Sequence, residues 1–288
     1  MKPEILVGVD GSPSSAAAVD WAARDAALHN LSLTLIHVLA APVVMTFPET
    51  PLPPGYTEWQ RDQGERHLRK AVEIAEAAGA PRVAAEIVVG STVPTLVDSS
   101  REAARLVVGS RGHGRLRRVL LGSVSSSLVR HAHCPVAVIH EEHPVDPSRT
   151  GVEPVVVGID GSQVSEAATA LAFEEAALRG AELVAVYAWH DTGLMDFPGV
   201  DTAAMASEGE LALAERLAGW RERYPDVTVR RVVVDDRPAD QLIDQSREAQ
   251  LVVVGSHGRG GFTGMLLGSV SQAVVQSAHS PVIVVRPA

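Results

Sequence analysis

The chain has 288 residues, of which 46% are hydrophobic, and carries a formal net charge of -10. This negative balance argues against a nucleic-acid-binding protein, because affinity for phosphate backbones comes mainly from clustered lysine and arginine. A single cysteine, Cys134, excludes an intrachain disulfide. No run of about 18 apolar residues and no signal-peptide pattern occurs, so we expect a cytoplasmic protein without a membrane span.

Strands and helices alternate in the first half of the chain. Ser14 is a candidate N-cap for a helix, because small apolar residues such as Val19, Ala22 and Ala26 follow it at helical spacing. The other predicted helices are residues 59–78, 93–103 and 123–131, and the predicted strands are residues 4–10, 31–38, 82–89, 105–108 and 135–140. Residues 40–57 contain five prolines and are predicted to be irregular.

This alternation predicts the fold class. Strands separated by helices pair in parallel through right-handed crossovers, and helices then cover both faces of the sheet. We therefore predict an α/β fold with open, five-stranded parallel sheets of the Rossmann-like strand order 3-2-1-4-5.

The second half repeats the first. VVVGIDGS, which begins at Val155, matches ILVGVDGS at Ile5, and residues 120–140 share twelve of twenty-one identities with residues 266–286. We therefore predict two tandem domains, residues 1–143 and 153–288, joined by a linker of residues 144–152. The two copies are least similar at residues 40–57 and 190–207.

A glycine-rich loop follows the fourth predicted strand of each repeat. Two residues separate its first two glycines, and nine more precede a Gly-Ser pair that opens the next helix. These positions are Gly109, Gly112, Gly122 and Ser123 in the first repeat, and Gly255, Gly258, Gly268 and Ser269 in the second.

The predicted topology places this loop beside an aspartate. Strands one and four are neighbours, so Asp10 and Gly109 should lie together at the carboxyl edge of the sheet, as should Asp160 and Gly255. Glycine allows a close backbone approach, and the N-terminus of a helix attracts an anion. The alternative that Gly-Ser is only a helix cap is less attractive because the spacing occurs twice.

Other sites fit the sequence less well. Neither loop has the Gly-Lys-Ser/Thr of a P-loop, and the chain contains no GxGxxG or GxSxG motif. His131, His133 and Cys134 could suggest a metal site, but the second repeat has serine in place of His131 and Cys134. A junction between a helix and a strand is the better interpretation of that segment.

The VGVDGS opening, the G-x2-G-x9-G-[ST] loop and the LLGSVS segment together resemble the universal stress proteins, of the tandem ATP-binding type found in actinobacteria. The resemblance covers nearly the whole chain. It implies that ATP is the ligand, with Mg²⁺ carried in on its phosphates and no metal site formed by the protein alone. It also implies that the two domains pair within the chain and that the protein forms a homodimer.

The resemblance also assigns roles by position. Val9 and Asp10 would meet the adenosine, Val38 would lie against the adenine, and the Gly-Ser segment would hold the phosphates. The implied residues of the first repeat are Val9, Asp10, Val38, Val108, Gly109, Gly112, Gly122, Ser123, Val124 and Ser125. Those of the second repeat are Ile159, Asp160, Ala188, Val254, Gly255, Gly258, Gly268, Ser269, Val270 and Ser271.

The two repeats differ where the ligand would bind. Ala188 is smaller than Val38, so we expect the adenine pockets to differ in affinity. The first loop has arginine at positions 111, 115, 117 and 118, whereas the second has only Arg259 among glycines. If these arginines reach the phosphates, the first site should bind ATP more tightly and with the stronger salt dependence.

We therefore expect an ATP-binding regulator of a stress or growth-arrest response, acting on an unidentified protein partner. No catalytic residue is predicted, because Asp10 and Asp160 are the only suitably placed carboxylates and the resemblance assigns them to the nucleoside. A slow ATPase that uses the same sites and a scaffold that binds no nucleotide are the alternatives.

Overall fold

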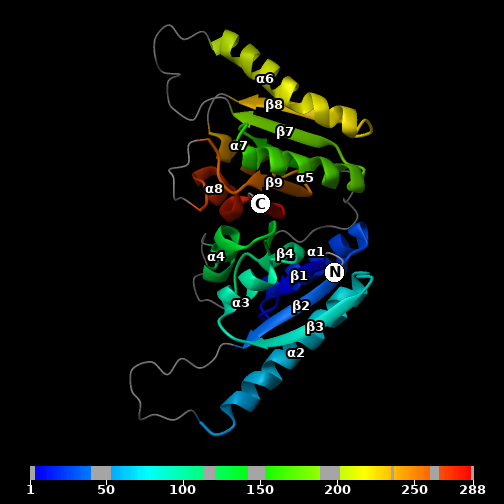
Figure 1. Cartoon of the computed structure of the whole chain (residues 1–288), viewed down its shortest axis with the longest axis vertical. Helices are drawn as coiled ribbons and strands as arrows, with labels where there is room; N and C mark the ends of the chain where they lie inside the picture. The colour runs from blue at the N-terminus through cyan, green and yellow to red at the C-terminus, as the bar shows by residue number, and fades with distance from the viewer. Residues whose placement is uncertain are drawn as a thin grey trace. The chain divides into compact units, whose positions relative to one another are not determined.

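The computed structural model describes residues 4–39, 53–112, 121–141, 153–188, 202–234, 237–259 and 266–286. The chain divides into two compact units, Met1–Glu141 (unit 1) and Glu142–Ala288 (unit 2). Each unit alternates strands with helices and is described by itself (Figure 1).

The strands of unit 1 all run parallel. They lie in the order β3-β2-β1-β4-β5, as predicted for each repeat. They are β1 (Glu4–Gly8), β2 (Ser32–Leu39), β3 (Val83–Val89), β4 (Ala103–Gly109) and β5 (Val136–Ile139). The predicted α/β fold class is confirmed. Because β1 is flanked by β2 on one side and β4 on the other, the chain reverses its winding direction at β1.

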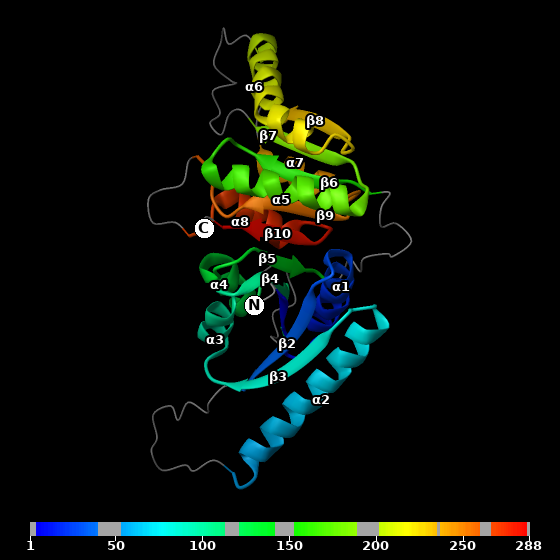
Figure 2. The ribbon, with the colours of Figure 1, turned by 45° about the vertical axis from the view of Figure 1, so that its right-hand side comes forward.

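Four helices cover the strands of unit 1. They are α1 (Pro13–His29), α2 (Tyr56–Ala77), α3 (Thr92–Ser99) and α4 (Ser123–His131). Helix α1 packs against α2, and α3 packs against α4, so the two pairs lie on opposite faces (Figure 2). The crevice between β1 and β4 is therefore bordered by the start of α1 on one side and the start of α4 on the other.

Several predicted helix ends in unit 1 are wrong. Helix α2 begins at Tyr56, inside the segment 40–57 that was predicted to be irregular. Ser12, not Ser14, is the N-cap of α1, and its Oγ accepts a hydrogen bond from the backbone N–H of Ser15 at 3.2 Å. Pro13 explains the earlier start, since its fixed φ and missing N–H suit the first helical position. Helix α3 ends at Ser99 rather than at residue 103, because Ala103 already belongs to β4.

The core of unit 1 is built from small aliphatic side chains. Ala18, Ala22 and Ala26 of α1 are fully buried, which lets the helix approach the strands closely. Aromatic side chains are rare in the core, since Phe173 of unit 2 is the one aromatic residue among the largest fully buried side chains of the described part. It stacks on Trp220 and Tyr224, with ring centroids 6.0 and 5.7 Å away.

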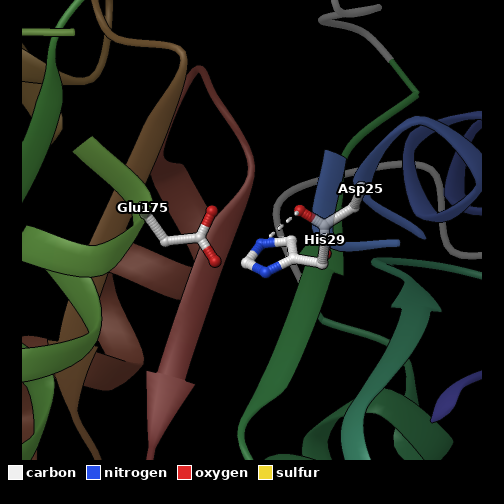
Figure 3. A group of neighbouring side chains, drawn as sticks. All are labelled: Asp25, His29 and Glu175. Atoms are coloured by element: carbon white, nitrogen blue, oxygen red, sulfur yellow. Dashed lines mark ion pairs between the residues drawn. The ribbon is translucent and has the colours of Figure 1, made fainter. Parts of the chain in front are cut away.

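A buried ion pair links α1 to β4 in unit 1. The carboxylate of Asp25 accepts a hydrogen bond from Nη1 of Arg105, and the two side chains are only 1% and 6% exposed. His29, one turn further along α1, points its ring at Asp25, with Nε2 3.7 Å from Oδ1 (Figure 3).

Unit 2 repeats the architecture of unit 1. Its parallel strands are β6 (Val155–Ile159), β7 (Leu183–Ala188), β8 (Val229–Val234), β9 (Leu251–Gly255) and β10 (Val282–Val285), in the order β8-β7-β6-β9-β10. Its helices are α5 (Gln163–Arg179), α6 (Thr202–Arg223), α7 (Pro238–Gln245) and α8 (Ser269–Ser277). Glu175 of α5 corresponds in sequence to Asp25, but it pairs with Arg179 on its own helix, at 2.9 Å.

Cys134 lies between α4 and β5 and should be unreactive in the folded protein. Burial raises the pKa of its thiol to about 12, outweighing the opposing effects of a backbone hydrogen bond and of Arg105. The nucleophile is the thiolate, so we expect no measurable alkylation by iodoacetamide at pH 8 and complete alkylation in guanidinium chloride. Mass spectrometry of the intact chain measures both, and rapid labelling of the folded protein would contradict the prediction.

Candidate functional site

The β1–α1 turn places Asp10 at the crevice of unit 1. Because β1 and β4 pair in parallel, with Val7 opposite Val107, both strands end at the same edge. The Asp10 Oδ1 accepts the backbone N–H of Ser12 at 2.9 Å, which closes the turn around Gly11. Gly11 has a φ of +82°, a conformation that glycine adopts without strain.

The loop after β4 reaches Asp10 at Gly112. A Cβ atom built on Gly112 would lie 2.5 Å from Oδ2 of Asp10, so any larger residue here would displace the Asp10 carboxylate. The same loop is tied to the start of α1 by Ser14, whose Oγ accepts the N–H of Arg111 at 3.3 Å. The structure therefore brings together Asp10, Gly109 and Gly112, three of the residues expected at the site.

The end of the loop forms the start of α4. The N–H of Gly122 donates to the carbonyl of Ser110 at 2.8 Å, which holds the loop closed at its base. Gly122 is the N-cap of α4 and, lacking a side chain, makes no cap hydrogen bond. The first N–H groups of α4 therefore have no serine or aspartate side chain as a cap, and they can donate hydrogen bonds to an anion.

Ser125 is placed differently from the phosphate-binding role implied for it. Its Oγ donates to the carbonyl of Gly109 at 2.6 Å, and the residue is buried. Ser271 does the same to Gly255 in unit 2, at 2.5 Å. A hydroxyl has one hydrogen, so in this structure both serines brace the loop instead of offering a donor to a ligand. Ser123 and Ser269, at the first helical positions, are exposed.

Unit 2 builds the same arrangement around Asp160. Its Oδ1 accepts the N–H of Ser162 and its Oδ2 accepts the N–H of Arg259, both at 2.9 Å. Burial raises the pKa of Asp160, but the hydrogen bonds from these backbone groups and from serine side chains outweigh it, so the pKa lies below its ordinary value. Each carboxylate oxygen keeps a lone pair for a further donor. A Cβ atom on Gly258 would collide with Oδ2 of Asp160.

The apolar residues implied for the adenosine end lie at the ends of the strands. Val9, Val108, Ile159 and Val254 are buried at the carboxyl ends of the central strands. Val38 is the last residue but one of β2 and Ala188 is the last of β7, and both are half-buried. The N–H of Val9 donates to the carbonyl of Ile36 at 2.9 Å, which brings the β2 end next to Asp10.

The sequence analysis missed the contribution of α2 and α6. His67 of α2 lies against Gly11, where a Cβ atom would come within 2.5 Å of its ring. His37 of β2 stands beside it, with ring centroids 5.4 Å apart, and its Nδ1 is 2.6 Å from the carbonyl oxygen of Val9. In unit 2, Arg216 of α6 lies against Gly161 in the place of His67.

Several expectations fall outside the described residues. They concern the arginines at 115, 117 and 118, the glycines at 260, 261 and 264, and the irregular segments 40–52 and 189–201. Among the described residues, His131, His133 and Cys134 do not belong to a group of potential metal ligands.

Comparison with known proteins decides the family. The sequence model of the universal stress protein family matches residues 1–140 and again residues 151–286, which is nearly the whole chain in two copies. The chain belongs to the universal stress protein family. Among its relatives, two universal stress proteins of Mycobacterium tuberculosis, Rv2005c and Rv2623, are 57% and 54% identical over 286 residues, which cover 98% of this chain and 96% of each relative.

A solved structure supports the fold of this universal stress protein. The crystal structure of a universal stress protein from Archaeoglobus fulgidus superposes with a TM-score of 0.71, at 20% identity, over 99% of both chains. At that identity the likeness bears on the fold alone. In the part of the chain that the structure describes, none of the helices has the length and apolar character of a membrane span.

Proposed function

We propose that this universal stress protein binds ATP in both units and that nucleotide occupancy is the signal it passes on as a regulator of a stress or growth-arrest response. The observation that supports this most directly is the repeated crevice. In each unit an aspartate at the end of one strand meets a glycine loop from the next, beside a helix that begins with an uncapped glycine.

The parts of the crevice suit a nucleotide. The Asp10 and Asp160 carboxylates are fixed by backbone N–H groups and can accept hydrogen bonds from ribose hydroxyls. The buried valine and isoleucine side chains at the strand ends offer an apolar surface to a base, and the starts of α4 and α8 offer N–H groups to phosphates.

Binding without rapid turnover fits the same groups. Both oxygens of Asp160 already accept backbone N–H groups, so that carboxylate is poorly placed to hold Mg²⁺ directly or to act as a base. A divalent ion would then be held mainly by the phosphates of the nucleotide. The homodimer and the protein partner that the family resemblance implies stay predictions.

Replacing one aspartate should remove one site. We expect calorimetric titration with Mg-ATP to give two sites per chain for the natural protein, one for Asp10→Ala, one for Asp160→Ala and none for the double variant, because each carboxylate orients a separate nucleotide. ATP at about 100 times its dissociation constant should also stabilise the natural chain by roughly 2.7 kcal/mol, and the double variant not at all. Two sites remaining in the double variant would refute the assignment.

A further inference from the structure

Two guanidinium groups of unit 2 lie against one turn. Arg216 comes from α6 and Arg259 from the loop after β9, and a Cβ atom built on Gly161 would collide with the ends of both side chains. Gly161 has a φ of +76°, so the turn itself favours glycine, and the missing side chain leaves the space that the two arginines share.

The positive charge at this turn exceeds the negative charge that pairs with it. Arg216 Nη1 is 3.3 Å from Oε1 of Glu166, and its buried Nε has no hydrogen-bond partner among the described residues. In that same part of the chain the guanidinium of Arg259 has no ion pair or hydrogen bond, since Arg259 contacts Asp160 only through its backbone N–H. Asp160 also adjoins this turn, but its two oxygens already accept backbone N–H groups, so Glu166 is the one carboxylate among the described residues that is ion-paired with either guanidinium.

An anion would relieve the repulsion between the two guanidinium groups. Guanidinium groups present parallel N–H donors that match the oxygens of a phosphate, and two of them converging on one point can hold it from both sides. Arg259 also directly follows Gly258, whose Cα lies against the Asp160 carboxylate. A phosphate bound in this crevice is thus within the reach of an arginine that belongs to the glycine loop itself.

Unit 1 has no such pair among its described residues. His67 of α2 occupies the place of Arg216 beside the equivalent Gly11, and it is accompanied by the second imidazole of His37. A guanidinium is always protonated near neutral pH, whereas an imidazole is not a fixed cation. The two crevices therefore share their aspartate and glycines but differ in fixed positive charge.

We propose that Arg216 and Arg259 bind the phosphates of the nucleotide in unit 2 and make this site selective for highly charged nucleotides. This rests on the proposed function, because it assigns a role within that nucleotide site. ATP is then strongly preferred over AMP and adenosine in unit 2, through a pair of arginines that the described residues of unit 1 do not repeat.

The test uses the full chain carrying Asp10→Ala, so that only the unit 2 site binds. Isothermal titration with ATP, AMP, adenosine and inorganic tripolyphosphate is compared before and after adding Arg216→Gln or Arg259→Gln. We expect each glutamine to weaken the binding of ATP at least tenfold, which corresponds to about 1.4 kcal/mol, and to change the affinity for adenosine less than twofold. The binding of tripolyphosphate should weaken in parallel with the binding of ATP.

A matched control is Arg221→Gln, at an exposed arginine of α6, in the Asp10→Ala chain, where the affinity of the unit 2 site for ATP should change less than threefold. Arg216 and Arg259 are both partly exposed, and circular dichroism checks that each variant is folded. An equal loss for adenosine would assign the arginines to the base or ribose and overturn the proposal, as would unchanged ATP affinity. If no chain binds ATP, the proposed function fails, and tripolyphosphate alone then decides whether the arginines bind polyphosphate.

Discussion

Asp25→Asn should lower the free energy of unfolding by about 3–5 kcal/mol, the cost typical of removing one partner of a buried ion pair. The amide keeps the shape of the carboxylate but not its charge, so the buried Arg105 of β4 loses this ion pair in the core of unit 1. Its guanidinium also lies over the ring of Trp21, 5.8 Å from the centroid, which offers only a weak substitute for the lost charge.

Urea unfolding, followed by far-ultraviolet circular dichroism, measures this loss. Because the chain has two units, hydrogen-exchange mass spectrometry is needed to assign the loss to one of them. Peptides of α1 and β4 should exchange faster in the variant, whereas peptides of unit 2 should show smaller changes.

The chain itself suggests the control. Leu251, fully buried at the start of β9, stands where unit 1 has Arg105, so an apolar side chain fits this position of the fold. Adding Arg105→Leu to Asp25→Asn also removes the buried positive charge, and the double variant should be more stable than Asp25→Asn alone. A double variant as unstable as, or less stable than, the single one would show that packing, and not charge, dominates here.

The repeated sequence was sufficient to predict the fold. Apolar runs such as those that became β1 and β6 are too short for helices and end in Asp-Gly-Ser turns, so strand, turn and helix follow in order. The N-cap of α1 was predicted wrongly because two nearby serines can both fill that position. Ser12 and Ser14 are both good helix caps, and Ser14 is instead used to hold the loop after β4 through the N–H of Arg111.

The approach of Asp10 to Gly112 could be inferred because it follows from strand order and from residues next to strand ends. His67 and Arg216 could not, since each lies in the middle of a long helix. Which side chain of α2 meets Gly11 depends on the register of the helix, and that register is set by buried contacts such as those of Leu68 and Ala71. Helices α2 and α6 also differ too much in sequence to be aligned by eye.

The two crevices therefore differ at side chains of α2 and α6, which could not be matched from the sequence. The arginines of the first loop suggested that unit 1 would bind ATP more tightly, but most of them lie outside the described residues. The described residues instead bring two arginines together in unit 2, where the loop sequence alone contributes only Arg259.

Gly109→Ala should be the most damaging single-methyl substitution at the loop, and Gly255→Ala in the same place of unit 2 should be much milder. A Cβ atom on Gly109 would lie 2.7 and 2.8 Å from the carbonyl carbon and oxygen of Ser14, which are backbone atoms of α1 and cannot rotate away. On Gly255 the nearest atoms are Cγ1 and the carbonyl carbon of Val164, at 3.1 and 3.3 Å, which need to move only slightly.

We therefore expect Gly109→Ala to destabilise unit 1 by about 1–3 kcal/mol, as overpacking of a well-packed core does, and Gly255→Ala to cost unit 2 clearly less. Because α1 must shift away from β4, the hydrogen bond from Arg111 to Ser14 should weaken too, and nucleotide binding by unit 1 should fall with it. Urea unfolding with unit-resolved hydrogen exchange, followed by titration with Mg-ATP, measures both effects. Equal destabilisation by the two alanine substitutions would contradict the prediction, because the space available for a Cβ atom would then not determine the cost of the substitution.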